Sequence, residues 1–94
     1  MNVEIRGIDL TEASRTRLQH RLSFALGRLG DDVSRVWVHL ADQGQRCRVL
    51  VRMQQLPDVM VEGRDSNLDA VIERTVHKAG LATRRELARR AGKL

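Results

Sequence analysis

The sequence predicts an α+β domain with the element order βαβββα, built as a four-stranded mixed sheet with both helices packed on one face. Three observations predict this fold. Four short segments alternate apolar and polar residues, which is typical of strands with one buried face. Two longer segments repeat apolar residues at helical spacing. The chain has 94 residues, enough for one modest core, so we expect residues 1–94 to form a single domain.

The first strand is expected over residues 2–7, where Val3 and Ile5 occupy one face. The first helix follows it, with Thr11 as the predicted N-cap and Gly30 as the predicted C-cap glycine. The buried stripe of this helix is expected to consist of Leu18, Leu22, Ala25, Leu26 and Leu29. Because the helix must connect two parallel strands, we expect a right-handed crossover.

The other three strands are expected over residues 33–41, 46–53 and 59–63, joined by tight turns and therefore antiparallel. Their outward positions and the first strand form an open sheet face with Arg6, Arg35, Trp37, His39, Arg48, Leu50 and Arg52. Sheet-based RNA binders use several aromatic rings, and this face has one. We therefore interpret Trp37 as packed under its apolar neighbours and arginine stems rather than as a base-stacking platform.

A long amphipathic helix is expected from residue 65 to near the C-terminus. Asp65 is its predicted N-cap, and Asp69 lies early in the helix, where the helix dipole favours negative charge. Its buried stripe is expected to consist of Leu68, Val71, Ile72, Thr75, Val76, Ala79 and Ala82. Gly80 is expected to kink or fray the helix, because glycine costs about 1 kcal/mol relative to alanine in a helix interior.

Positive charge is concentrated in this last helix. The whole chain has a net charge of +5. Residues 74–94 contain seven Lys or Arg and one acid, whereas residues 1–73 contain ten Lys or Arg and eleven acids. An anionic partner would therefore meet the last helix first. Arginine outnumbers lysine fifteen to two, which suits bidentate phosphate contacts and is equally expected from a GC-rich genome.

Each helix also carries a line of three cations beside its buried stripe, with an apolar residue in the third place. The line on the first helix consists of Arg17, Arg21, Phe24 and Arg28, and the line on the second of Arg74, Lys78, Leu81 and Arg85. Like charges four residues apart are mildly unfavourable in an isolated helix. One such line alone is typical of a solvated helix face. Two lines together with the basic C-terminus favour binding to an anionic partner.

Catalytic and metal-binding patterns are absent from the sequence. It has no glycine-rich phosphate loop, no nucleophile elbow and no paired histidines at metal-binding spacing, since His20, His39 and His77 fall on three different elements. Cys47 is predicted to point inward as a small core residue, and as the only cysteine it indicates a reducing compartment. We find no signal peptide and no membrane span. The sequence thus predicts a cytoplasmic protein that is not an enzyme and needs no cofactor, metal or small-molecule substrate.

Three segments carry a resemblance to a known family: N-V-E-I-R-G-I-D-L-T-E-A, V-S-R-V-W-V-H-L and above all V-E-G-R-D-S-N-L-D-A-V-I-E-R-T-V-H-K-A. They resemble the ribosome hibernation promoting factor family, also called ribosome-associated inhibitor or sigma-54 modulation protein. The resemblance covers essentially the whole chain. It is closest to the short type, because the chain shows neither the second domain of long members nor the extended tail of inhibitor-type members. It implies a βαβββα fold that binds the small ribosomal subunit.

Proteins of this family bind in the decoding channel and occlude the mRNA and tRNA sites when growth stops, in stationary phase or under stress. They contact ribosomal RNA through basic residues of both helices. Carried over by position, these residues are Arg17, Arg21, Arg28, Arg74, Lys78, Arg84, Arg85, Arg89 and Arg90. The usual lysines of the family are mostly arginines here, which keeps the charge. The resemblance thus implies a translation inhibitor that acts sterically and is monomeric off the ribosome.

Two other functions stay open on the residues alone. A small basic module of this kind could dock its last helix on an acidic protein, such as a transcription factor. It could also bind double-stranded nucleic acids generally. Steep weakening with rising salt and a preference for assembled small subunits over free duplex would favour the ribosomal function.

Overall fold

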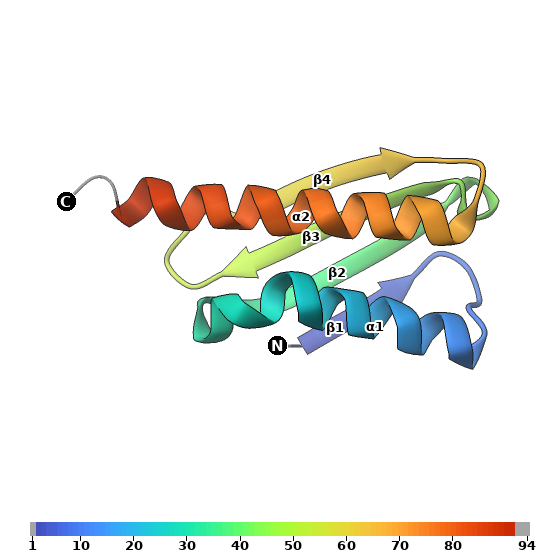
Figure 1. The fold of residues 1–94 in the computed structure, drawn as a ribbon, viewed down its shortest axis with the longest axis horizontal. Helices are drawn as coiled ribbons and strands as arrows, with labels where there is room; N and C mark the ends of the chain where they lie inside the picture. Colours follow the sequence, from blue (N-terminus) through green and yellow to red (C-terminus); the bar gives the residue numbers. More distant parts are fainter. Residues whose placement is uncertain (1, 92–94) are drawn as a thin grey trace.

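The computed structural model describes residues 2–91 (Figure 1). The elements are β1 (Asn2–Arg6), α1 (Glu12–Leu26), the 3-10 turn η1 (Gly27–Asp32), β2 (Val33–Ala41), the 3-10 turn η2 (Asp42–Gly44), β3 (Arg46–Met53), β4 (Val59–Arg64) and α2 (Leu68–Ala91). The sheet has the strand order β1-β2-β3-β4; β1 is parallel to β2 and the other pairs are antiparallel. Both helices cover one face of the sheet (Figure 1), as predicted.

The core lies between this sheet face and the two helices. Alternate residues of the strands are buried against the helices, as the sequence pattern predicts. The buried apolar side chains are Val33, Val36, Val38 and Leu40 of β2, Cys47, Val49, Val51 and Met53 of β3, Val59 of β4, Leu18, Leu22 and Leu26 of α1, and Val71, Ile72, Val76 and Ala79 of α2. Thr75 and Thr83 are also buried, and their hydroxyls donate to the carbonyl oxygens one turn earlier, at 2.6 and 2.7 Å. These bonds satisfy the two hydroxyls inside an otherwise aliphatic core.

The first helix begins as predicted and ends earlier than predicted. The Thr11 hydroxyl accepts a hydrogen bond from the backbone N–H of Ser14 at 3.1 Å, which caps the first turn. The C-cap is Gly27 rather than Gly30. The prediction was wrong because the chain does not turn left-handed here: Gly27 has right-handed helical angles and continues into η1, which contains Gly30.

The N-cap of α2 is Asn67, so the prediction of Asp65 was wrong. The Asn67 side-chain oxygen accepts from the backbone N–H of Ala70 at 3.1 Å, and its carbonyl oxygen accepts from Val71 at 2.9 Å. Asp65 lies two residues earlier, where its carboxylate accepts from the N–H of Asn67 at 3.2 Å and closes the turn before the helix. Asp69 lies in the first turn of α2, as predicted.

The second helix runs unbroken through Gly80, so the predicted kink is absent from the described helix. Gly80 is buried where α2 passes α1. A Cβ atom there would lie 3.3 Å from the carbonyl oxygen of Ala25 and 3.4 Å from its Cβ. The absence of a side chain thus permits close approach of the two helices, and this packing offsets the low helix propensity of glycine.

Replacing Gly80 by valine is expected to lower the free energy of unfolding by about 1–3 kcal/mol, because the added methyl groups must push α1 away. Urea denaturation followed by circular dichroism measures the change. Ala88→Val is the matched control, because Ala88 lies on the exposed side of the same helix. It should cost only the propensity difference, about 0.7 kcal/mol or less. Equal effects of the two changes would show that the helices do not press on each other at Gly80.

Candidate nucleic-acid interface

The two helices lie side by side and run in the same direction (Figure 1). Two ion pairs bridge them: Arg17 Nη1 lies 3.1 Å from Asp69 Oδ2, and Arg21 Nη1 lies 3.4 Å from Glu73 Oε2. The line of cations on α1 therefore faces α2, and two of its arginines have acidic partners there. The sequence does contain the signal for this pairing, since arginines and acids repeat at the same four-residue spacing on the two helices. It was missed.

The line of cations on α2 lies on the other side of that helix, toward β4. Arg74 Nη2 lies 3.8 Å from Asp65 Oδ2. Lys78 Nζ donates a hydrogen bond to the backbone carbonyl oxygen of Glu62 in β4 at 3.1 Å. The structure thus separates the two predicted lines: one borders the junction between the helices, and the other borders the edge of the sheet.

Of the remaining predicted cations, Arg28 lies just after α1, in the 3-10 turn η1, and the others lie in the C-terminal half of α2. Arg89 Nη1 lies 3.2 Å from Glu86 Oε1, and Arg90 donates to Gln55 Oε1 at 3.3 Å. Arg28, Arg84 and Arg85 are exposed and form no ion pair with another residue whose side chain the structure describes. Exposed ion pairs contribute little to stability, so a phosphate can replace a carboxylate partner at small cost. Among the described side chains, these three arginines have no carboxylate partner to exchange.

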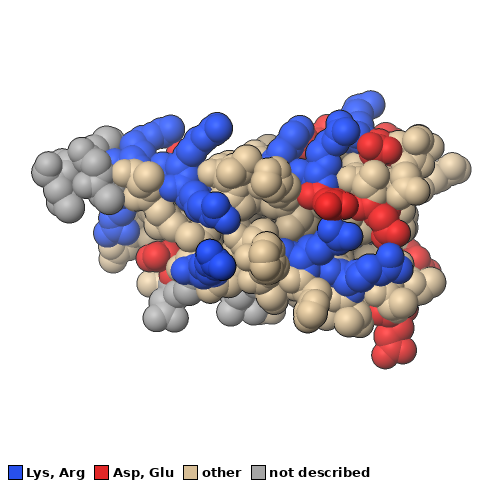
Figure 2. Space-filling view, viewed as in Figure 1, with Lys and Arg blue, Asp and Glu red and all other residues tan. Residues whose placement is uncertain are grey.

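The distribution of charge over the helical face agrees with this description. In Figure 2 Lys and Arg atoms lie over both halves of this face, but most of the Asp and Glu atoms lie to the right, so the Lys and Arg atoms at the left, over the C-terminal half of α2, have few acidic neighbours. Residues 81–91 contain four arginines and one glutamate. The positive potential of the helical face is therefore strongest beside the C-terminal half of α2.

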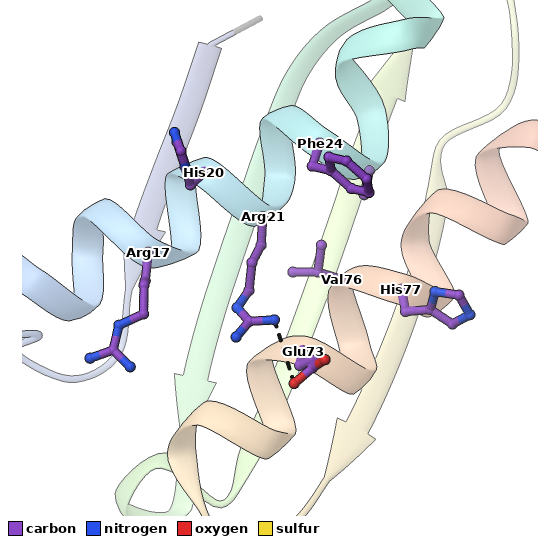
Figure 3. A pocket seen from close by; sticks show the side chains of 8 residues that line it. Arg17, His20, Arg21, Phe24, Glu73, Val76 and His77 are labelled. Atoms are coloured by element: carbon purple, nitrogen blue, oxygen red, sulfur yellow. Dashed lines mark ion pairs between the residues drawn. The ribbon is translucent and has the colours of Figure 1, made fainter.

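A groove of about 500 Å³ lies between α1 and α2 (Figure 3). It is lined by Arg17, His20, Arg21, Phe24 and Ala25 of α1 and by Glu73, Val76 and His77 of α2. Phe24 is 81% exposed, the highest value among the large apolar side chains of the described residues that are exposed. The sequence pattern places Phe24 in the line of cations but does not predict the groove, because the groove depends on how the two helices meet.

The open sheet face offers fewer free cations. The half-buried ring of Trp37 has the guanidinium groups of Arg35 and Arg52 over it, 4.9 and 4.8 Å from its centroid. This confirms the interpretation that arginines cover the ring. Arg48 Nη2 lies 3.1 Å from Glu62 Oε2, and this hydrogen bond is the largest cause that lowers the pKa of Glu62. Carboxylates thus neutralise much of the positive charge of this face.

Cys47 is fully buried in the core, as predicted. Burial raises the pKa of its thiol from its ordinary value of 9.0 to about 11, against a smaller, opposing effect of the hydrogen bond with Thr75. At neutral pH the thiol is therefore protonated and shielded, which is unsuited to a nucleophile.

The described residues contain no group of three or more His, Cys, Asp or Glu placed to hold a metal ion. Over the same part of the chain, no helix has the length and apolar character to cross a bilayer.

The folded protein is expected to protect Cys47 from Ellman's reagent at pH 8, and unfolding in urea should expose it. Because the pKa of the thiol is higher in the folded state than in the unfolded state, the folded state holds its proton more tightly. The free energy of unfolding should therefore fall as the pH rises from about 9 to about 11, and Cys47→Ala should remove that part of the pH dependence. Rapid labelling of the native protein would contradict the burial of this side chain.

Three comparisons with known proteins bear on the family and the fold of this chain. The sequence profile of the family described as sigma 54 modulation protein / S30EA ribosomal protein matches residues 1–93. The fold is similar to the Protein Y N-terminal domain of Thermus thermophilus, with 25% identity, a TM-score of 0.74, and coverage of 90% of this chain and 98% of that one. It is also similar to a ribosomal subunit interface protein from Coxiella burnetii, with 16% identity, a TM-score of 0.70, and coverage of 97% and 99%.

No curated protein sequence matches the chain significantly. The family assignment therefore depends on the profile, and the T. thermophilus and C. burnetii structures support the same fold. Because the profile match extends over nearly every residue, the chain belongs to the sigma 54 modulation protein / S30EA ribosomal protein family of ribosome-associated factors.

Proposed function

We propose that this protein is a ribosome hibernation factor. It binds ribosomal RNA of the small subunit in the decoding channel, blocks access of mRNA and tRNA, and so inhibits translation in stationary phase or under stress. The observation that carries this proposal is that Arg28, Arg84 and Arg85 are exposed and have no ion pair among the described side chains, in a chain that belongs to a ribosome-associated family. The family supplies the ribosome as the partner, and the charge supplies the reason for binding RNA.

The proposed mechanism is steric and electrostatic. Arg28, Arg84 and Arg85 bind phosphates directly, and the paired cations exchange a carboxylate or neutral partner for a phosphate. The folded body has extents of 44 × 21 × 17 Å, so a site filled by it has no room for a nucleic-acid strand. No covalent step, cofactor or small-molecule substrate is part of the proposal. The protein acts as a monomer in the cytoplasm, and residues 1–94 form its ribosome-binding domain.

Purified protein is expected to co-sediment with small ribosomal subunits at low salt and to lose affinity steeply as the salt concentration rises, because binding releases counterions from RNA. The measurement is a sedimentation assay over a salt series, paired with inhibition of cell-free translation. Free duplex RNA of matched concentration is the competitor. Strong competition by the duplex would indicate general nucleic-acid binding instead.

A protein partner predicts a different result. If the basic helix docked on an acidic protein, the protein would not co-sediment with small subunits even at low salt. Nuclease treatment of the ribosomal RNA adds a second criterion, because an RNA-held complex is lost when its RNA is digested. Retention of the complex after complete digestion would contradict binding through RNA.

A further inference from the structure

Phe24 is the one aromatic side chain on the helical face, and the described chain leaves its ring 81% exposed. A phenylalanine side chain that lies mostly in solvent adds little to the stability of the fold. Exposed rings of this kind are typical of binding surfaces, where they supply a large, rigid contact area. Phe24 also interrupts a line of arginines, with Arg21 one turn before it and Arg28 one turn after it.

The groove beside Phe24 combines apolar and polar surfaces. Val76 lies between the two helices, with Phe24 and His77 on one side of it and the Arg21–Glu73 ion pair on the other; Arg17 lies farther along, beyond the pair (Figure 3). The floor is therefore apolar, while one edge offers both a guanidinium donor and a carboxylate acceptor. The Arg21–Glu73 pair has a 3.4 Å separation and is partly exposed to solvent, so either group can exchange its partner at small cost.

We propose that this groove binds one unpaired nucleobase of the RNA, stacked on the ring of Phe24 and lying over Val76. The polar edge of the base reaches the Arg21–Glu73 pair, and the phosphate of a neighbouring nucleotide binds Arg28. The inference deepens the proposed function, on which it rests. It adds a contact to a base, whereas the arginines alone contact only phosphates.

Charge complementarity favours a nucleotide over an apolar protein surface as the occupant. A protein that covered the Phe24 ring would also have to desolvate the arginines on either side of it, which is costly without anionic partners. A nucleotide satisfies both requirements, because its base has flat apolar faces and its phosphate neutralises a cation. The chain carries a net charge of +5, which also draws a polyanion toward this face.

The test compares Phe24→Leu, Phe24→Tyr and Phe24→Ala for equilibrium binding to small ribosomal subunits. Leucine keeps the apolar bulk and removes the aromatic face, whereas tyrosine keeps the face. We expect Phe24→Leu and Phe24→Ala to weaken binding by about 5- to 100-fold and Phe24→Tyr to bind like the wild type. The slope of log affinity against log salt should not change, because no phosphate contact is removed.

Met60→Ala is the matched control, because Met60 is also a large exposed apolar residue, 62% exposed, and lies in β4 on a different surface. It should leave affinity unchanged. Equal unfolding midpoints of the variants show that the Phe24 changes act on binding. Wild-type affinity of Phe24→Leu together with weak binding of Phe24→Ala would indicate apolar packing against a protein and overturn the stacking proposal, as would unchanged affinity of all three variants.

The proposed function and the stacking proposal fail in different ways. If the wild-type protein does not bind small subunits, the proposed function fails, and stacking is then decided with a short single-stranded oligouridylate and its abasic counterpart. Tighter binding of the oligouridylate than of the abasic strand, lost in Phe24→Leu and kept in Phe24→Tyr, supports the base site. Equal binding of the two strands, or no binding of either, overturns it.

Discussion

Replacing Gly7 by alanine is expected to lower the free energy of unfolding by about 2–6 kcal/mol, from roughly 1–3 kcal/mol of backbone strain and 1–3 kcal/mol of overpacking. Gly7 follows β1 and has φ = +113°, a region that side chains other than glycine rarely adopt. A Cβ atom there would also overlap the backbone carbonyl group of Leu40 in β2. Backbone atoms of a central strand cannot move aside as a side chain can.

Such a loss is a large part of the 5–15 kcal/mol that stabilises a typical domain. Urea denaturation measures it, and Gly27→Ala is the matched control. Gly27 has φ = −62°, and a Cβ atom there would meet nothing within 4 Å. Gly27→Ala should therefore be neutral or stabilise the domain by up to about 1 kcal/mol. If Gly7→Ala were as stable as Gly27→Ala, the close contact between the end of β1 and β2 would be refuted.

Changing Arg28, Arg84 and Arg85 together to glutamine is expected to weaken binding to small subunits by roughly two orders of magnitude at about 0.1 M salt. Each neutralised phosphate contributes about 0.7–0.9 to the slope of log affinity against log salt, so the slope should become shallower by about two to three. The three side chains are exposed, so the fold should be unaffected. Inhibition of cell-free translation should fall in parallel.

The matched control is the triple change of Arg6, Arg48 and Arg64 to glutamine. It removes the same total charge from strands β1, β3 and β4, at exposed positions of the sheet rather than of the helices. If binding depends on the helical face, this control should keep the salt slope of the wild type and lose only the long-range part of the attraction. Equal losses in the two triple variants would mean that net charge, and not the helical face, determines binding.

The sequence by itself determined the fold class. The alternation in β2 and β3 separates Val36, Val38 and Val49 from the outward arginines, and periodicity along one element is enough to predict such a separation. The concentration of arginine after residue 80 is likewise a property of the sequence, and the structure displays it as a basic surface over α2. The family could also be recognised from the residues, because its segments run through the whole chain.

Only the tertiary structure decided how the two helices meet, and the groove follows from that. Arg17 and Asp69 are 52 residues apart in the chain, and their ion pair depends on the angle and offset between helices, which periodicity along one helix does not specify. Gly80 shows the same limit: local propensity predicts a weak point, while contact with Ala25 makes it a place of close packing. The exposure of Phe24 beside this contact is likewise set by the separation of two packed helices, which no single segment of the sequence encodes.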